Sequence, residues 1–316
     1  MHLLRYAGLR LLSAIPTILL VGIAVFLIVR LVPGDPARIL LGDAATEEAL
    51  ADLRGQMGLD RSIVEQFIIW GGNVLRGDLG NSIANGHPVL PLVLDRFAVS
   101  SSIVLVAVGL AALVAVPAGM LAAWRQGSAR DLAVVALSSL LLSLPSFWLG
   151  LILLLVFGLE LGWLPVVGYV PLADDARGWL IGLILPIATL ALVEVGVIAR
   201  MARSATIEVR RLEYIAHARA KGLRESTVLW VHAFPNAFAP TWTLLGLILG
   251  NLLGGIAVVE TVFTIPGLGR LLVDAIYARD YPVVQGCLLF IALVYVVVNA
   301  LVDLAYPLLD PRVTAE

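Results

Sequence analysis

The stretch Glu213–Asn236, EYIAHARAKGLRESTVLWVHAFPN, is a polar and basic run inside a very apolar chain. It contains Lys221, the only lysine of the sequence, followed directly by Gly222. Residues 213–221 predict a short helix, in which Gly222 takes a left-handed C-cap position and Lys221 is favourable in the last turn. The chemistry that this pattern favours is recognition, because a helix exposed between two hydrophobic segments offers a surface for another protein to grip.

A second helical piece is expected after this glycine. Ser226 or Thr227 can cap its start, and Pro235 is expected to stop it. The whole stretch is too polar to cross a membrane and is therefore predicted to be a loop between two spans.

Residue types that perform catalysis or bind metals are too scattered to form a site. The lone Cys287 lies in an apolar run and is interpreted as a small buried hydrophobic residue, so no disulfide framework or cysteine metal site is expected. The sequence contains no GxxxxGK[ST], no GxSxG and no paired aspartates within a span. The four histidines are not at ligand spacing: His2, His87, His217 and His232. We therefore expect no enzyme activity, no metal and no cofactor bound by this chain.

The composition is that of a polytopic membrane protein. Hydrophobic residues make up 60% of the chain and charged residues only 14%, and the mean hydropathy is +0.98. A soluble core of 316 residues does not need so much apolar surface.

Six membrane spans are predicted from the uncharged runs. The first, Leu11–Val29, follows Arg5 and Arg10 and lacks a small-residue cleavage site, so it is interpreted as an uncleaved span rather than a signal peptide. Five more follow: Phe97–Trp124, Leu132–Leu159, Trp179–Ala199, Phe238–Val259 and Val283–Val302.

The charge distribution orients these spans. With the N-terminus inside, the cytoplasmic pieces hold twelve Arg or Lys and six Asp or Glu, whereas the outer pieces hold nine and fifteen. Short cytoplasmic segments with a positive excess follow the positive-inside rule. The stretch from Glu213 to Asn236 and both termini are therefore expected in the cytoplasm.

The series Ala216-x-Ala218-x-Ala220-Lys221-Gly222, with Pro235 thirteen positions after the glycine, resembles the EAA loop of permease subunits of binding-protein-dependent ABC importers. In that family the loop is a cytoplasmic coupling helix seated in a groove of the ATPase subunit. This chain has alanine at the family's opening glutamate and Phe234 at its leucine, and its ARAKG and PNA forms are those of the peptide-transporting branch. The alternative is an ordinary basic loop retained in the cytoplasm. The resemblance implies these coupling residues: Glu213, Ala216, Ala218, Arg219, Ala220, Lys221, Gly222, Pro235 and Asn236.

The segment 31–95 is the longest predicted non-spanning region and carries nine acidic residues. Two helices are expected in it, from Thr46 to Met57 with Thr46 as N-cap, and from Ser62 to Leu75. The phrases LVPGDPA, MGLD and GDLGNS mark turns before, between and after these helices. In the same order they resemble the N-terminal external domain of oligopeptide, dipeptide and nickel permeases.

The outer loop 260–282, ETVFTIPGLGRLLVDAIYARDYP, is a third segment that resembles the peptide-permease branch. Its glycines and proline require a tight turn of low bulk. The resemblance implies an external gate and a contact with the binding protein, and the alternative is a re-entrant or packing loop. The residues implied are Glu260, Phe263, Pro266, Gly267, Gly269 and Asp280.

Polar residues inside the predicted spans are costly if they face lipid. We therefore expect Glu194, Asn251, Asn299 and Asp303 to line the translocation path, to face a partner subunit or to approach the headgroups. The small residues of the fifth span permit close helix packing, and they also suit a path: Gly250, Gly254 and Gly255.

The sequence thus predicts an all-α, multi-pass protein of the bacterial inner membrane with the type I ABC importer permease fold. It divides into residues 1–30, an external helical region 31–95, and a five-helix core 96–316 with a coupling loop 200–236. The resemblance implies a second homologous permease, two cytoplasmic ATPases that bind ATP and Mg²⁺, an external substrate-binding protein, surrounding lipid and no nucleic acid. Peptides are the expected substrates; glutathione, nickel chelates and oligosaccharides are the alternatives on the same fold. A stand-alone secondary transporter is the rival class, but inverted repeats with paired broken helices are not visible.

Overall fold

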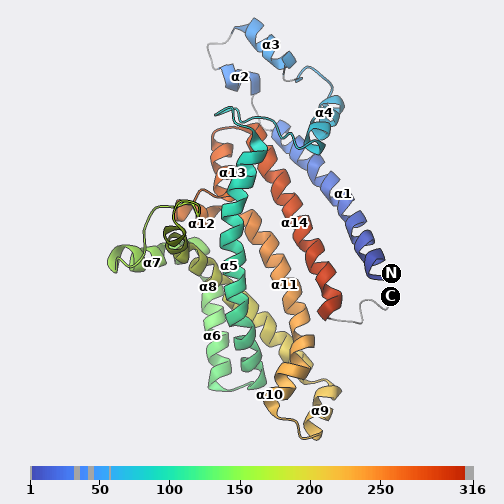
Figure 1. Ribbon diagram of the computed structural model, residues 1–316, viewed down its shortest axis with the longest axis vertical. Helices are drawn as coiled ribbons and strands as arrows, with labels where there is room; N and C mark the ends of the chain where they lie inside the picture. The colour runs from blue at the N-terminus through green and yellow to red at the C-terminus, as the bar shows by residue number, and fades with distance from the viewer. Residues whose placement is uncertain (1, 32–35, 42–45, 57, 310–316) are drawn as a thin grey trace.

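The computed structural model describes residues 2–31, 36–41, 46–56 and 58–309, and these residues form helices with no β-strand (Figure 1). This confirms the all-α prediction. The long helices are α1 (His2–Leu31), α5 (Val89–Trp124), α8 (Ala176–Arg210), α11 (Phe234–Gly255) and α14 (Tyr281–Leu309). The shorter helices are α2 (Pro36–Leu41), α3 (Glu47–Gln56), α4 (Ile63–Leu75), α6 (Ala129–Ser143), α7 (Ser146–Leu153), α9 (Glu213–Ala220), α10 (Glu225–Thr227), α12 (Ala257–Val262) and α13 (Leu268–Tyr277).

The core of the bundle is built on α5 and α8, which pack along most of their length. They approach each other closely at Gly119, where a Cβ atom would overlap the backbone carbonyl of Ala199. Glycine is needed at this point because the obstacle is backbone, which cannot rotate away. Small and branched side chains from both helices fill the rest of the interface and are fully buried, among them Ile103, Ala107 and Ile198.

Two of the three glycines predicted to allow close helix packing do so between α11 and α14. A Cβ on Gly250 would lie 2.6 Å from the Tyr295 ring, and one on Gly254 would lie 3.3 Å from Ile291. The prediction is wrong for Gly255: outside its own stretch of helix, no described residue has an atom within 4 Å of its Cβ position.

Four helices among the described residues are long and apolar enough to cross a membrane, and a bent helix pair makes a fifth candidate. The bent pair corrects the prediction of one continuous span over Leu132–Leu159. Helix α6 ends at Ser143, and α7 departs at 98° after a break at Leu144 and Pro145. Leu144 is extended because the ring of a following proline excludes the helical region. The count of six spans stays a prediction, since the described apolar part of α1 is the shorter segment Ile15–Ile28.

The segment after Gly222 also differs from its prediction. Helix α10 begins at Glu225 with Arg224 at the N-cap position, so neither Ser226 nor Thr227 caps it. A π-helical segment, Val228–Ala233, then continues into α11, with Pro235 in its first turn rather than at its end. The wider π turn and the first-turn position both accommodate a proline, which lacks an N–H group.

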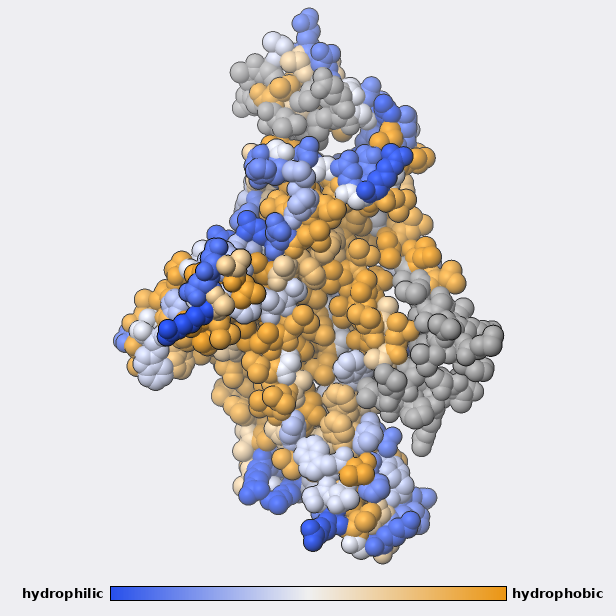
Figure 2. Space-filling view, in the orientation of Figure 1, coloured by the Kyte–Doolittle hydropathy of each residue, from blue (hydrophilic) through white to orange (hydrophobic). Residues whose placement is uncertain are grey.

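The two predicted loop regions lie at opposite ends of the bundle. Helices α2, α3 and α4 cover one end, and α9 and α10 lie at the other, beside the turn between α5 and α6 (Figure 1). Figure 2 shows a broad hydrophobic surface between two ends where hydrophilic residues gather. This is the surface expected of a multi-pass membrane protein.

The first end contains the two helices expected there. Thr46 Oγ1 accepts a hydrogen bond from Ala49 N, and Ser62 caps α4 by accepting one from Glu65 N. Helix α4 is attached to α1 by a cluster of Phe26, Phe67 and Trp70 and by the Arg30 guanidinium, which donates to Gln66. Residues 32–35 of LVPGDPA and Met57 of MGLD lie outside the described residues.

Candidate functional site

Helix α9 is fixed to the bundle by its inner face and ends as its sequence predicts. Ile215 and Ala218 are buried and belong to the main core, which they share with Val228 and Leu229. Gly222 has a φ of +76°, and its N–H donates to Arg219 O, which confirms the left-handed C-cap.

The other face of α9 is open. The coupling candidates on it are all exposed: Glu213, Ala216, Ala220, Lys221 and Gly222. Apart from its two chain neighbours, no described residue has an atom within 4 Å of the Cβ position of Gly222. Since Ala218 points inward, the small residues available to a partner are Ala216 and Ala220. Such a surface allows the backbone of the helix to approach another protein closely.

The far end of the loop is tied back to α9. Asn236 Nδ2 donates to the hydroxyl oxygen of Tyr214 at 2.8 Å, and that hydroxyl contacts the carbonyl of His232 at 3.4 Å. Pro235 and Asn236 are both exposed. The two parts of the predicted coupling loop therefore form one surface, although 13 positions separate Gly222 from Pro235.

A polar cluster connects this surface to the end of α5. The Trp124 indole Nε1 donates to Glu225 Oε2 at 2.8 Å. Arg219 donates to the same carboxylate at 2.9 and 3.1 Å, and its guanidinium carbon lies 5.0 Å from the centre of the Trp124 ring. The hydrogen bonds from Arg219 lower the pKa of Glu225. A carboxylate that is ionised throughout the neutral range thus joins the loop to α5.

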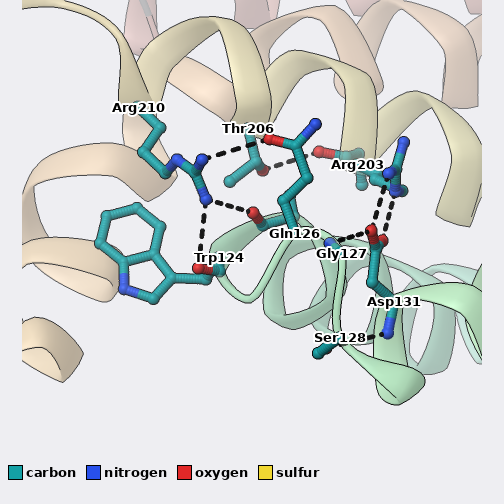
Figure 3. Close-up of polar contacts among 10 residues, drawn as sticks. Trp124, Gln126, Gly127, Ser128, Asp131, Arg203, Thr206 and Arg210 are labelled. Carbon is teal, nitrogen blue, oxygen red and sulfur yellow. Dashed lines mark hydrogen bonds and ion pairs between the residues drawn. The ribbon is translucent and has the colours of Figure 1, made fainter.

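The turn between α5 and α6 is held by two arginines of α8 (Figure 3). Arg210 donates to the carbonyls of Ala123 and Trp124 at 2.9 and 3.2 Å, which satisfies the exposed end of α5. Arg203 forms a bidentate ion pair with Asp131 at 2.6 and 2.9 Å. Its hydrogen bonds lower the pKa of Asp131 to about 2. The pair therefore stays intact at any pH above that of strong acid.

The residues implied for the external gate are mostly buried. Glu260 is inaccessible to solvent, and its carboxylate accepts hydrogen bonds from Ser100 Oγ and from Arg270 N at 2.8 Å. It thus caps the first turn of α13, where an anion is favourable. A Cβ on Gly267 would overlap this carboxylate, and one on Gly269 would lie 2.6 Å from Ala257 N. Phe263 is also buried, and Pro266 is half-buried.

Asp280 holds the GDLGNS loop against the start of α14. It is buried and accepts hydrogen bonds from Ser82 Oγ, from Ile83 N at 3.1 Å and from Ala84 N at 3.2 Å. Two segments that the resemblance singled out separately, 77–82 and 260–282, are thus in contact. The contacts described here therefore stabilise the fold of this chain.

The candidates for the translocation path are dispersed. Glu194 is buried in α8, whereas Asn251 is exposed in a groove of about 410 Å³ between α1, α11 and α14. Asn299 donates to the carbonyl of Tyr295, one turn earlier in α14, and Asp303 is half-buried. The structure does not bring these four residues together.

The sequence-based reasoning missed Trp124, Asp131, Arg203 and Arg210. Their signal is weak in one sequence, because arginines near span ends are already explained by orientation. Only Trp124, at the junction of an apolar run and a basic turn, stands out by type. Among the described residues no group of three or more His, Cys, Asp or Glu is placed to hold a metal ion.

Two family models match the chain. The binding-protein-dependent transport system inner membrane component matches residues 115–315, and the corresponding N-terminal model matches residues 3–104. A putative peptide transport system permease protein of Brucella suis is 44% identical over 304 residues, covering 96% of this chain and 97% of that protein. A dipeptide transport system permease of Alkalihalophilus pseudofirmus is 36% identical, and a glutathione transport system permease of Pectobacterium atrosepticum is 41% identical; each match covers 98% of this chain and 99% of the relative. The chain therefore belongs to the family of inner membrane components of binding-protein-dependent transport systems, the permease subunits of ABC importers.

Proposed function

We propose that this chain translocates di- and oligopeptides across the bacterial inner membrane as one of two homologous permease subunits. The observation that carries the proposal is the exposed face of α9. The helix ends at the left-handed Gly222, and its opposite face is packed in the core. Relatives that match nearly the whole chain and are named peptide and dipeptide permeases support the substrate class.

In this proposal α9 docks on an ATPase subunit, and both termini and the loop 200–236 lie in the cytoplasm. Two ATPase subunits bind ATP and Mg²⁺, and their closure moves α9 and shifts the bundle between inward- and outward-open states. An external binding protein delivers the peptide at the opposite end, near α2–α4 and α13. The chain itself catalyses no reaction.

Uptake of a radiolabelled dipeptide tests the proposal, in cells that lack their other peptide importers and express this chain with its co-encoded subunits. We expect uptake that requires ATP and is lost when this chain is deleted. Competition with unlabelled peptide, glutathione, a nickel chelate and an oligosaccharide separates the substrate alternatives. Uptake that follows an ion gradient and survives ATP depletion would instead assign the chain to the secondary transporters.

A further inference from the structure

Three parts of the chain meet at Trp124, the last residue of α5. Arg210 of α8 grips its backbone carbonyl, and Glu225 accepts a hydrogen bond from its indole. Arg219, from the end of α9, lies over the indole ring and binds Glu225 at the same time. Figure 3 shows the Trp124 ring and the Arg210 side chain on the same side of the turn between α5 and α6.

These contacts form a closed triangle of three side chains. A bidentate arginine–carboxylate pair fixes the orientation of both groups, and a ring held by a hydrogen bond and a cation at once has little freedom to turn. One such exposed contact alone contributes little to stability. Groups that restrain one another fix a geometry more firmly than separate pairs do.

We propose that Trp124 is the point through which displacement of α9 reaches α5, and that Arg219 and Glu225 are positioning residues that keep this joint rigid. The inference rests on the proposed function, because it concerns how movement imposed on α9 by an ATPase is transmitted. It separates two roles within the loop. Ala216, Ala220 and Lys221 form the docking face, whereas Arg219 faces the permease.

The contacts that fix the end of α5 determine which helices move when Trp124 is displaced. Its end is bound to α8 through Arg210, and the neighbouring turn is bound to α8 through the pair of Asp131 and Arg203. Helices α5 and α8 are also locked by the close contact at Gly119. A push on Trp124 therefore moves both helices together instead of bending one of them.

The first test measures coupling in the complete transporter reconstituted in liposomes, with the dipeptide that the chain imports. Arg219→Ala, Glu225→Ala and the double variant are compared with Arg130→Ala, which removes an exposed arginine from the start of α6. We expect all variants to retain the ATPase subunits and their ATP hydrolysis. Dipeptide transported per ATP is expected to fall about five-fold in each loop variant, with the double variant no worse than either single one, and to be unchanged in Arg130→Ala.

Trp124→Phe separates the two contacts of the indole, since phenylalanine keeps a ring for Arg219 but cannot donate to Glu225. We expect an intermediate loss of coupling. Full coupling in Arg219→Ala and Glu225→Ala would overturn the proposal, and so would loss of the ATPase subunits from these variants, because that result assigns both residues to docking.

A distance measurement tests the joint directly, in the permease alone and in the complete complex, and does not depend on transport. Spin labels at Arg125→Cys and Leu223→Cys report on the two sides of the triangle, and the native Cys287 is buried and does not react. We expect one narrow distance distribution, equal in the nucleotide-free and vanadate-trapped complexes, that broadens in Glu225→Ala. A broad distribution in the native sequence would contradict a rigid joint. If the chain bound no ATPase at all, the proposed function would be wrong. The distance distribution measured in the permease alone would still show whether the joint exists.

Discussion

At the scale of single residues, Gly222 combines a left-handed backbone conformation with free space around its Cβ position. Because no described residue beyond its chain neighbours lies within 4 Å of its Cβ position, the limit that the described structure places on a substitution there is backbone conformation. Alanine at a φ of +76° costs about 1 kcal/mol, whereas asparagine adopts this region more easily. The two substitutions therefore separate backbone strain from contact with a partner.

We predict that Gly222→Asp and Gly222→Asn insert normally into the membrane, because insertion depends on the apolar runs and their flanking arginines. Both variants are expected to lose the ATPase subunits during purification, since any side chain obstructs a closely docked surface, and Gly222→Ala is expected to lose them less. Co-purification and uptake are measured on the same membranes. Normal uptake by Gly222→Asp would remove Gly222 from the docking surface.

What the sequence reveals of single residues depends on how local their contacts are. The cap at Gly222 is predictable because its hydrogen-bond partner, Arg219, is only three residues away. The bond from Trp124 to Glu225 spans 101 positions, and that from Ser82 to Asp280 spans 198, so neither can be inferred from spacing. Glu260 is a buried cap of α13, a contact that its spacing does not predict, and its gate role stays a prediction.

At the scale of helices, the α5–α8 contact gives a prediction with an internal control. A Cβ at position 119 meets the carbonyl of Ala199, whereas Gly109, on the same helix, has nothing within 4 Å. Forcing extra atoms into a tight contact lowers the free energy of unfolding by about 1–3 kcal/mol. Replacing a helical glycine that has free space around it with alanine raises the free energy of unfolding by about 1 kcal/mol. Gly119→Ala should therefore destabilise the bundle, while Gly109→Ala should not.

The buried thiol of Cys287 supplies the measurement for these two variants. A thiol-reactive dye becomes fluorescent when heating exposes Cys287, which gives an unfolding midpoint in detergent. We expect the midpoint of Gly119→Ala to fall by several degrees and that of Gly109→Ala to equal or exceed the native one. Equal midpoints in both variants would show that α5 and α8 can separate at no cost.

The helices themselves were predicted well because a long uncharged run must cross the membrane as a helix. The positions where helices break were not predicted, because hydropathy carries no information on backbone geometry. The run over Leu132–Leu159 is uniformly apolar, yet Pro145 bends it by 98°. Pro235 gave the opposite error, since it lies in the first turn of α11, where a proline is tolerated.

At the scale of the whole molecule, the acidic region and the basic loop occupy opposite ends of one bundle (Figure 1). The acidic excess of the predicted outer segments and the basic excess of the predicted cytoplasmic loop therefore lie on two separate surfaces. The hydrophobic surface between them, seen in Figure 2, fits a bilayer. In the proposed function, movement imposed on α9 by an ATPase is transmitted along α5 and α8 to the opposite end, where α13 lies.

The orientation itself is the last prediction. A reporter fused after residue 80 should lie outside the inner membrane and one fused after residue 220 inside, because the segments that flank the second site carry most of the cytoplasmic arginines. Single cysteines at Asn85 and Leu223, both exposed, test the same point in the full-length chain with a membrane-impermeant maleimide. Asn85→Cys should react in intact spheroplasts and Leu223→Cys only after lysis, while buried Cys287 gives no background. Reaction of both sites in intact spheroplasts would place α9 outside, where no cytoplasmic ATPase can reach it, and reaction of both only after lysis would place residue 85 in the cytoplasm; either result would overturn the three crossings predicted between the two sites.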